Sequence, residues 1–535
     1  MAASTMAPED SKVEKGPLNT EKVIEKQPND AVITESNYST QESGVIGSQS
    51  IKDVEKQRRG HATDVGDHAV CDEERIDWDE PDDPEKPMNW PTGKKARNII
   101  IICYVTFLTP LGSTMFAPAV EDVMEAYRST NPELASFVVS VFILGYFFGP
   151  LFLGPLSELY GRLPVYLTCN VLFTIFNIAC AVSNNLGSLI VFRFLAGTFG
   201  GCPITLGAGS FGDMIQIDQR GKIIAIWALG PLMGPVIGPV AGGYMGEHLN
   251  WRWIFWVLAI AAGVGAVAAF IFQDETYPPI ILQRKVKRLQ EETGNPNLCS
   301  ILDTDRRASH VFAYAIIRPI HLFFFSPIVM LFSLYQGVIY GYLYLLFTTF
   351  PLVFGNQYHF SQGTVGLAYL GIGAGSIVGL GVAGYASDKI VRRMAKDGGM
   401  KPEYRLPPLI PACFLIPTGL FWYGWSAHAH DHWIVPILGT VLIGMGLNVL
   451  FMCVATYLID AYPYYEASAT AASTAVRSLI GALLPLAGRR MYATLGLGWG
   501  NSLLGFMALA MCPLPWIFFK YGERIRTNPK FQIKW

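Results

Sequence analysis

The chain has 535 residues, of which 51% are hydrophobic and only 15% are charged, with a formal net charge of −2 and a mean hydropathy of +0.32. Ordinary soluble domains carry about 25% charged residues, so this composition argues against a soluble enzyme and favours a chain that meets lipid with most of its surface. The near-neutral balance gives no basic field of the kind that binds nucleic acid, and we expect no nucleic-acid partner.

The first 96 residues differ in composition from the rest of the chain. Residues 1–96 are rich in Ser, Thr, Glu, Asp and Lys and contain few large apolar residues. Such a segment cannot bury enough apolar surface to fold alone. Residues 1–12 also lack the basic and apolar regions of a signal peptide. We therefore predict that residues 1–96 form a disordered cytoplasmic tail, which acts as a solvated spacer.

Twelve apolar stretches follow the tail. Each is long enough to cross the hydrocarbon core as a helix, which takes about 20 residues. Six lie in residues 97–272 and six in residues 325–519, with a polar central loop at 273–324 and a polar tail at 520–535. The stretches lie near 98–120, 135–154, 164–183, 187–209, 223–245, 253–272, 325–350, 364–386, 408–426, 433–457, 468–488 and 498–519. We predict an all-α membrane protein of two six-helix bundles, with a site at the interface between the halves.

The basic residues of the loops predict the orientation. If the N-terminus is cytoplasmic, 24 Lys and Arg lie on the cytoplasmic side and only 4 on the other. Cytoplasmic loops carry the excess of Lys and Arg, so both termini and the central loop are expected to face the cytoplasm. The basic run Arg284–Arg288 in the central loop predicts an amphipathic helix on the inner leaflet.

The second stretch ends in a turn rich in glycine and charge, which runs from Gly154 through Glu158 and Gly161 to Arg162. Glu158 and Arg162 are four residues apart, so they share one helical face. The turn resembles the loop between spans 2 and 3 of the major facilitator superfamily. That motif carries Asp where this chain has Glu158, and often a second basic residue where this chain has Leu163.

The resemblance implies a charge cluster at the cytoplasmic ends of the helices. Asp213, just before the next loop, is the expected partner of Arg162, and Arg220 follows in that loop. Asp388 occupies the second-half position that corresponds to Glu158. Our hypothesis is that the cluster of Glu158, Arg162 and Asp213 gates the inner side and that protonation loosens it.

The interiors of the predicted helices contain two charged residues, Arg193 and Arg477, and no Asp or Glu. A charge inside a membrane is costly and normally faces a cavity or a partner. The lack of a carboxylate argues against a dedicated site for multivalent cations. It favours a neutral or anionic, amphipathic, ring-containing solute. Candidates to line the substrate cavity are aromatic and polar residues of the same helices: Phe116, Phe142, Tyr146, Gln336, Tyr340, Tyr344, Asn448 and Met452.

The fifth stretch carries a glycine at every fourth position, with prolines beside the glycines. The glycines form one stripe that permits close helix contact. The prolines remove three backbone donors and predict a kink. The stripe consists of Gly230, Gly234, Gly238 and Gly242, flanked by Pro231, Pro235 and Pro239. This pattern is similar to the antiporter signature of the superfamily, which is found mainly in exporters.

Over residues 85–520 the chain resembles the fungal twelve-span drug:proton antiporter branch of that superfamily, with landmarks that include Asn89-Trp-Pro91, Pro110–Pro118 and Glu275-Thr-Tyr277. The resemblance implies proton-coupled export of hydrophobic small molecules, such as drugs, fungicides, toxins or secondary metabolites, by alternating access. It implies the plasma membrane rather than the vacuolar membrane. We expect a monomer, because the sequence shows no oligomerisation device beyond glycine stripes that the bundle itself can use. Two alternatives stay open: an uptake symporter for a nutrient, and a non-transporting sensor that signals through the tail.

Motifs for catalysis, nucleotides and metals are absent from the sequence. It contains no G-x-x-x-x-G-K-[ST], G-x-S-x-G or H-E-x-x-H, so we expect no enzyme activity, no cofactor and no ATP drive. The run His428-Ala-His-Asp-His432 has the residue types of a metal site. Short His runs on loops are usually incidental, and we assign no metal.

Overall fold

The structure, a computed structural model, describes residues 75–79, 82–302, 308–394, 401–462 and 465–528. The tail predicted to be disordered therefore lies outside the described residues up to residue 74. The first half of the bundle consists of α2 (Thr92–Thr114), η2 (Ala117–Ala119), α3 (Val120–Ala126), α4 (Pro132–Tyr160), α5 (Arg162–Ala181), α6 (Leu186–Gly200), α7 (Cys202–Met214), α8 (Ile217–His248) and α9 (Arg252–Phe272).

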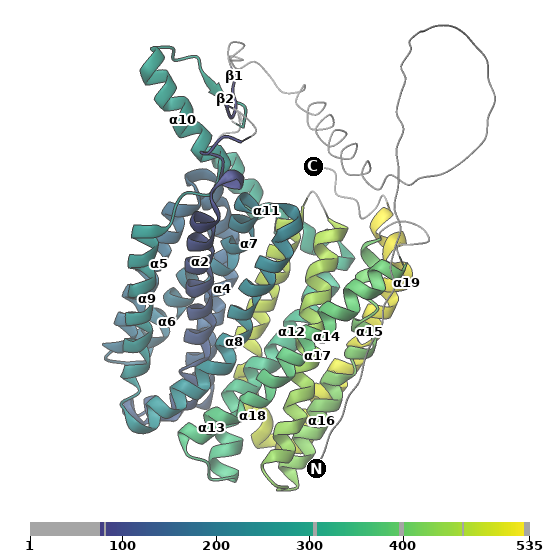
Figure 1. The fold of residues 1–535 in the computed structure, drawn as a ribbon. Helices are drawn as coiled ribbons and strands as arrows, with labels where there is room; N and C mark the ends of the chain where they lie inside the picture. The colour runs from purple at the N-terminus through teal and green to yellow at the C-terminus, as the bar shows by residue number, and fades with distance from the viewer. Residues whose placement is uncertain (1–74, 80–81, 303–307, 395–400, 463–464, 529–535) are drawn as a thin grey trace, which may run out of the picture. The chain divides into compact units, whose positions relative to one another are not determined.

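The second half repeats this arrangement of long helices (Figure 1). Its elements are α12 (Pro327–Phe350), η3 (Pro351–Gln357), α13 (Gln362–Ala368), α14 (Leu370–Met394), η5 (Pro402–Arg405), α15 (Leu409–Ala412), α16 (Leu415–His428), α17 (Ile434–Ala461), α18 (Glu466–Met511) and α19 (Pro513–Thr527). Between the halves lie α10 (Pro278–Thr293) and α11 (Ala308–Phe325), so the predicted central loop of 273–324 is largely helical.

Eleven helical stretches in the described chain are long and apolar enough to cross a membrane. The last of them, Glu466–Arg526, has 61 residues. A continuous helix of that length would measure about 90 Å, three times the thickness of the hydrocarbon core. The backbone breaks at Gly496, where φ is +72°, and the Tyr492 hydroxyl donates back across the break to Asn501 Oδ1 at 2.9 Å. The stretch thus holds the last two predicted spans, and the twelve-helix prediction is confirmed.

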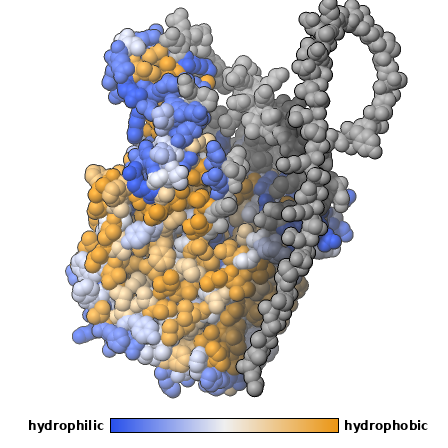
Figure 2. Space-filling view, in the orientation of Figure 1, coloured by the Kyte–Doolittle hydropathy of each residue, from blue (hydrophilic) through white to orange (hydrophobic). Residues whose placement is uncertain are grey.

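The wall of the bundle is apolar. Figure 2 shows hydrophobic surface along the bundle and hydrophilic surface at its ends. On α9, Ile260, Val264, Val267 and Ile271 follow a helical repeat and are about 60% exposed. A stripe of large, exposed aliphatic side chains on a helix is expected where the solvent is lipid.

The bundle has a basic end and an opposite end. The basic end is the one at which α2 begins and α19 ends, and it carries α10 (Figure 1). The opposite end carries η2, α3 and α13. Arg97 at the start of α2 pairs with Asp274 after α9 at 2.6 Å, which joins the first and last long helices of the first half at the basic end.

A segment before α2 packs on α10 at the basic end. This segment, residues 75–79 and 82–91, is called the strap. Its strand β1 (Arg75–Ile76) pairs in parallel with β2 (Cys299–Ser300), and its helical turn η1 (Pro87–Asn89) precedes the buried Trp90. The prediction of disorder to residue 96 is therefore wrong for this part, because partners distant in sequence supply the contacts that the strap lacks by itself.

The strap covers the buried face of α10. Leu282, Lys285 and Val286 form that face, and Lys285 Nζ lies 2.8 Å from Asp79 and 3.1 Å from the buried carboxylate of Asp83. The predicted helix at Arg284–Arg288 is present. Its buried face packs against protein, whereas the sequence predicts that a leaflet covers it.

Candidate functional site

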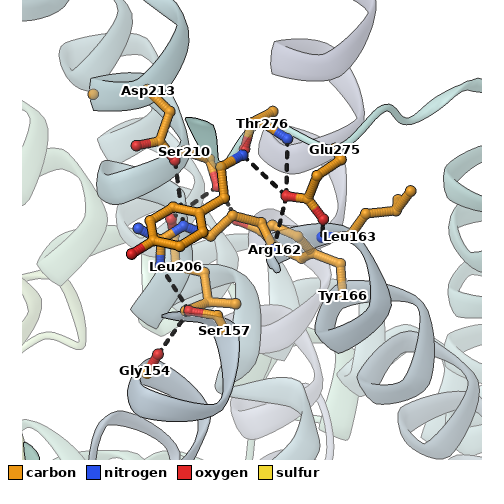
Figure 3. A network of polar contacts seen from close by, with 12 residues as sticks. Gly154, Ser157, Arg162, Leu163, Tyr166, Leu206, Ser210, Asp213, Glu275 and Thr276 are labelled. Atoms are coloured by element: carbon orange, nitrogen blue, oxygen red, sulfur yellow. Dashed lines mark hydrogen bonds and ion pairs between the residues drawn. The ribbon is translucent and has the colours of Figure 1, made fainter. Parts of the chain in front are cut away.

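The turn between α4 and α5 is built on a glycine and a distant carboxylate. Gly161 has φ +98°, a region that L side chains rarely adopt. A Cβ at this position would collide with the carboxylate of Glu275. Glu275 accepts the backbone N–H groups of Arg162 and Leu163 at 2.9 and 3.1 Å, and those of Thr276 and Tyr277 at 3.0 Å (Figure 3). The residue that follows the sixth span thus fixes the start of the third.

Arg162 extends from this turn into the cluster that the sequence predicts. Its Nε lies 3.3 Å from Asp213 Oδ2 and its Nη1 donates to Ser157 Oγ at 2.6 Å (Figure 3). The guanidinium also lies over the ring of Tyr277, 4.8 Å from the centroid. Burial raises the pKa of the Tyr277 hydroxyl, which keeps the ring neutral beside the cation. The geometry joins α4, α5, α7 and the segment after α9.

Other predicted members of the cluster take different places. Glu158 is exposed at the end of α4, and the structure describes no ion pair between it and Arg162. Arg220 donates to the carbonyl of Gly212 at 2.9 Å and so closes the α7–α8 turn. The side chain of Asp388 lies outside the described part of α14. Glu275 takes the place in the cluster that the sequence assigns to Glu158, because it accepts the N–H groups of the turn directly, whereas Glu158 acts on Arg162 only through its charge at longer range.

The glycine stripe of α8 packs against α2. A Cβ added at Gly230, Gly234 or Gly238 would lie 3.3, 2.7 or 2.5 Å from atoms of α2, and one at Gly242 would overlap the Met115 carbonyl. The four glycines therefore bring the two backbones into direct contact, as the stripe predicts. The helix continues without a break through Pro231, Pro235 and Pro239 from Ile217 to His248.

Arg193 is buried within the first half. Its Nε donates to the carbonyl of Val138 at 2.7 Å, and its Nη2 to those of Ser113 and Val139 at 3.3 Å. The guanidinium also lies over three phenyl rings: Phe116 at 4.8 Å, Phe142 at 5.4 Å and Phe255 at 5.7 Å. Carbonyls and rings of α2, α4, α9 and the turn after α2 thus solvate the charge in place of water.

Four predicted cavity residues meet at the interface between the halves. Phe142 and Tyr146 of α4 form an edge-to-face pair at 5.7 Å, as do Tyr340 and Tyr344 of α12 at 5.0 Å. The hydroxyls of Tyr344 and Ser113 lie 3.0 Å apart, which joins α12 to α2. We call Phe142, Tyr146, Tyr340 and Tyr344 the interface aromatics.

The remaining cavity candidates are more scattered. Gln336 Oε1 accepts from Ser473 Oγ at 2.6 Å, which joins α12 to α18. Phe116 lies at the opposite end in a buried apolar cluster and reaches Arg193 from there. Asn448 donates to Gly444 of its own helix, and Met452 packs near Gly384 of α14. The structure describes no contact from these last two to the interface aromatics.

Polar contacts join the two halves at the opposite end. Arg489 of α18 pairs with Glu121, and the neighbouring Arg490 lies 3.7 Å from Glu133. Gln362 of α13 donates to Asp122 at 2.6 Å, while Glu247 of α8 accepts from Gly363 N at 2.9 Å. No sequence pattern indicated these pairs, because the partners lie 100 to 370 residues apart.

Metal ligands are not gathered anywhere in the described chain: it holds no group of three or more His, Cys, Asp or Glu side chains arranged to bind an ion. In the His428–His432 loop, His428 packs edge-on against Trp425 at 5.6 Å and His432 lies over Trp433 at 5.1 Å.

Two helical halves, a glycine-packed helix pair and aromatic residues at the interface between the halves are features of a multi-pass membrane transporter. The chain belongs to the Major Facilitator Superfamily, whose family model matches residues 102–485. It is a membrane transporter and not an enzyme.

Fungal transporters are similar in sequence over most of the chain. The MFS-type transporter penM of Penicillium rubens is 58% identical over 465 residues, covering 87% of this chain and 92% of that protein. The efflux pump radE of Floropilus chiversii is 49% identical over 462 residues, covering 86% of each.

Among solved structures, the xylose transporter XylE from E. coli, in a partially occluded inward-open conformation, matches the fold with a TM-score of 0.62 and 15% identity. That match covers 80% of this chain and 98% of XylE.

Proposed function

We propose that the protein exports hydrophobic, amphipathic small molecules in exchange for protons, by alternating access across the plasma membrane. The contact of the α8 glycine stripe with α2 carries the proposal. Direct backbone contact gives the two helices a smooth surface, and the prolines beside it weaken α8 where the halves meet. A relative that is named an efflux pump and is 49% identical over 86% of the chain supports the direction of transport.

In this proposal the basic end faces the cytoplasm, because Lys and Arg are concentrated there. The cluster of Arg162, Asp213 and Glu275 is the inner gate. Protonation of a carboxylate in such a cluster removes a charge that pairs with Arg162, and so couples the gate to the proton gradient. The protein acts as a monomer.

The test is efflux from a yeast host that lacks its own pumps. Cells that express the chain are loaded with a panel of labelled amphipathic compounds, and efflux is followed with and without a protonophore. Export predicts efflux that the protonophore abolishes and that Asp213→Asn reduces at equal surface expression. Glu291→Gln, an exposed carboxylate on α10, is the matched control. Protonophore-insensitive efflux, or full proton-dependent efflux by Asp213→Asn, contradicts the coupling.

The two alternatives give different results in the same cells. An uptake symporter accumulates solute where an exporter depletes it. A sensor moves no solute in either direction, and deletion of residues 1–74 abolishes its signalling. Deletion of the same residues from an exporter leaves the transport rate per molecule unchanged.

A further inference from the structure

Arg477, the second arginine in the interiors of the helices, is partly buried and differs from the buried Arg193 in its partners. Arg477 of α18 lies over the rings of Tyr340 at 5.1 Å and Phe451 at 5.2 Å. Its Nε is buried and has no hydrogen-bond partner. In the part of the chain that the structure describes, no carboxylate lies within ion-pair distance of it. Arg193, by contrast, uses its donors on three carbonyls.

This difference matters because the two arginines have the same charge and nearly the same surroundings of rings. A guanidinium has five N–H donors, and a buried charge without a counter-charge is strongly destabilising. Ring faces compensate only part of that cost. A partly buried arginine in a membrane bundle, with a buried Nε that has no partner and no carboxylate within ion-pair distance, is explained if a bound molecule supplies the missing negative charge.

A second unpaired group lies beside Arg477. The hydroxyl of Tyr146, on α4 of the other half, is buried and has no partner. Tyr146 lies within electrostatic range of Tyr340, Arg193 and Arg477, and Arg477 lies directly over the Tyr340 ring, so the free hydroxyl and the unpartnered Nε belong to one neighbourhood. One half supplies the hydroxyl and the other supplies the charge. A molecule that binds both connects the halves.

The remaining walls of this neighbourhood are aromatic. Phe142 pairs edge-to-face with Tyr146, and Tyr340 pairs edge-to-face with Tyr344 and Phe451, so the neighbourhood offers aromatic faces and edges on which a further ring can stack. Planar Arg side chains bind carboxylates through two parallel hydrogen bonds, and the neutral Tyr hydroxyl can donate a third. The chemistry that fits is a flat aromatic body with a carboxylate on its edge.

We propose that Arg477 is the group that binds the carboxylate of the transported molecule, and that aromatic organic acids are the substrate class of this transporter. The proposal rests on the proposed export function and narrows it. Tyr146 binds the same headgroup from the opposite half, and the interface aromatics stack on the ring. Arg193 holds the first half together and does not contact the substrate.

Matched acids and esters test this assignment. The probes are 2-naphthoate, biphenyl-4-carboxylate and fluorescein, each with its methyl ester, which keeps the rings and removes the carboxylate charge. Equilibrium binding to the purified full chain in detergent is measured by calorimetry for the wild type, Arg477→Gln and Arg477→Lys. Arg524→Gln, an exposed arginine on α19, is the matched control.

We expect the wild type to bind at least one acid more than tenfold tighter than its ester. Arg477→Gln abolishes that preference and leaves ester affinity within about twofold, while Arg477→Lys keeps part of it. Arg524→Gln leaves both affinities unchanged. Because the ester reports the intact ring site, a misfolded variant is recognised by loss of both ligands, and Arg477→Lys then carries the test.

Three outcomes overturn the assignment: an unchanged acid preference in Arg477→Gln, equal or tighter binding of the esters by the wild type, or no saturable binding of any of the three acids. Transport in proteoliposomes with a pH gradient separates this inference from the proposed function. If esters move as fast as acids, export stands and the substrate class is wrong. If the acids bind through Arg477 and nothing moves, the site stands and export is wrong.

Discussion

The two halves carry equivalent charge clusters at the basic end, built from different residues. In the first half, Arg162 of the α4–α5 turn pairs with Asp213 at the end of α7. In the second half, Arg405 of η5, between α14 and α16, pairs at 2.9 Å with Asp460 at the end of α17. Both pairs join the loop after the second helix of a half to the end of its fourth. The internal repeat therefore preserves the place and sign of the pair.

Each cluster has a second contact. The segment at the last helix supplies an acid to this contact in the first half and a base in the second half. In the first half, the acid Glu275 follows the last helix and accepts the N–H groups of the turn. In the second half, the loop supplies the buried acid Glu403, and the base Arg526 of α19 lies 3.5 Å from it. Four backbone N–H groups satisfy Glu275, whereas neither carboxylate oxygen of Glu403 has a hydrogen-bond partner in the described structure. The acid of this second contact thus has more hydrogen-bond partners in the first cluster than in the second.

The largest expected effect comes from substitution of Arg162 and Arg405, the arginines of the two charge clusters. Arg162→Ala removes the ion pair, the bond to Ser157 and the contact with Tyr277, and it leaves Asp213 unpaired. Breaking a buried pair costs about 3–5 kcal/mol, and the partial exposure of this one places it near the lower value. We expect Arg162→Ala to lower efflux more than tenfold at equal surface expression and Arg405→Ala to lower it about threefold. Equal losses in the two variants would mean that the halves share the gating equally.

The second effect concerns the turn that only a glycine allows. Gly161→Ala forces a side chain to φ +98° and into the Glu275 carboxylate, so we expect a loss of about 2–4 kcal/mol of stability. Gly154→Ala is the control in the same segment, because it is helical and a Cβ there meets nothing within 4 Å. Thermal unfolding of the purified proteins measures both. A stable Gly161→Ala variant with a normal transport rate contradicts the role of this turn.

A third effect concerns the strap on α10. Burial raises the pKa of Asp83, but hydrogen bonds from the backbone N–H groups of Glu85 and Asp79 and from Lys285 outweigh it and leave the pKa below the ordinary Asp value. Burial lowers the pKa of Lys285, but its bonds to Asp79 and Asp83 outweigh it and leave the pKa above the ordinary Lys value. Asp83→Asn is expected to loosen the strap by about 1–2 kcal/mol.

The pH dependence of this effect follows from the two shifts. A lowered Asp pKa gives stability that is lost only as acid protonates Asp83, and a raised Lys pKa gives stability that is lost only as base deprotonates Lys285. Between about pH 5 and pH 9, protection of the strap amides from hydrogen exchange should therefore differ between the wild type and Asp83→Asn by a constant factor. A difference that changes steeply within that window points to another titrating group.

The smallest expected effect comes from the exposed Lys401–Glu523 pair at the edge of the second cluster. Lys401 Nζ lies 2.8 Å from Glu523, and both side chains are close to half exposed. Solvent screens such pairs, and side-chain ordering offsets the remaining attraction. Lys401→Ala should leave the melting temperature and the efflux rate unchanged within error. A clear loss of either would place the second cluster on a par with the first.

Much of the site was visible in the sequence where chemistry and spacing are local. The Arg162–Asp213 pair follows from a motif, and the close α8 contact follows from glycines at every fourth position. Glu275 was visible only as a landmark, since nothing local says that it accepts the N–H groups of a turn 113 residues earlier. The sequence did not predict the Arg405–Asp460 pair. In the second half it pointed to Asp388, but the repeat preserves the place of the pair in space and not a sequence motif.

The sequence by itself determined the twelve helices, the polar interval between the halves and the two arginines in their interiors, because the length and apolarity of a segment decide whether it can cross a membrane. The tertiary structure decided that Arg193 donates to three carbonyls while the Nε of Arg477 has no partner, that the strap is ordered on α10, and how Arg489 and Arg490 pair with the other half. These features depend on which groups meet after the chain folds, and hydrogen-bond partners tens to hundreds of residues apart leave no periodic signal in the sequence.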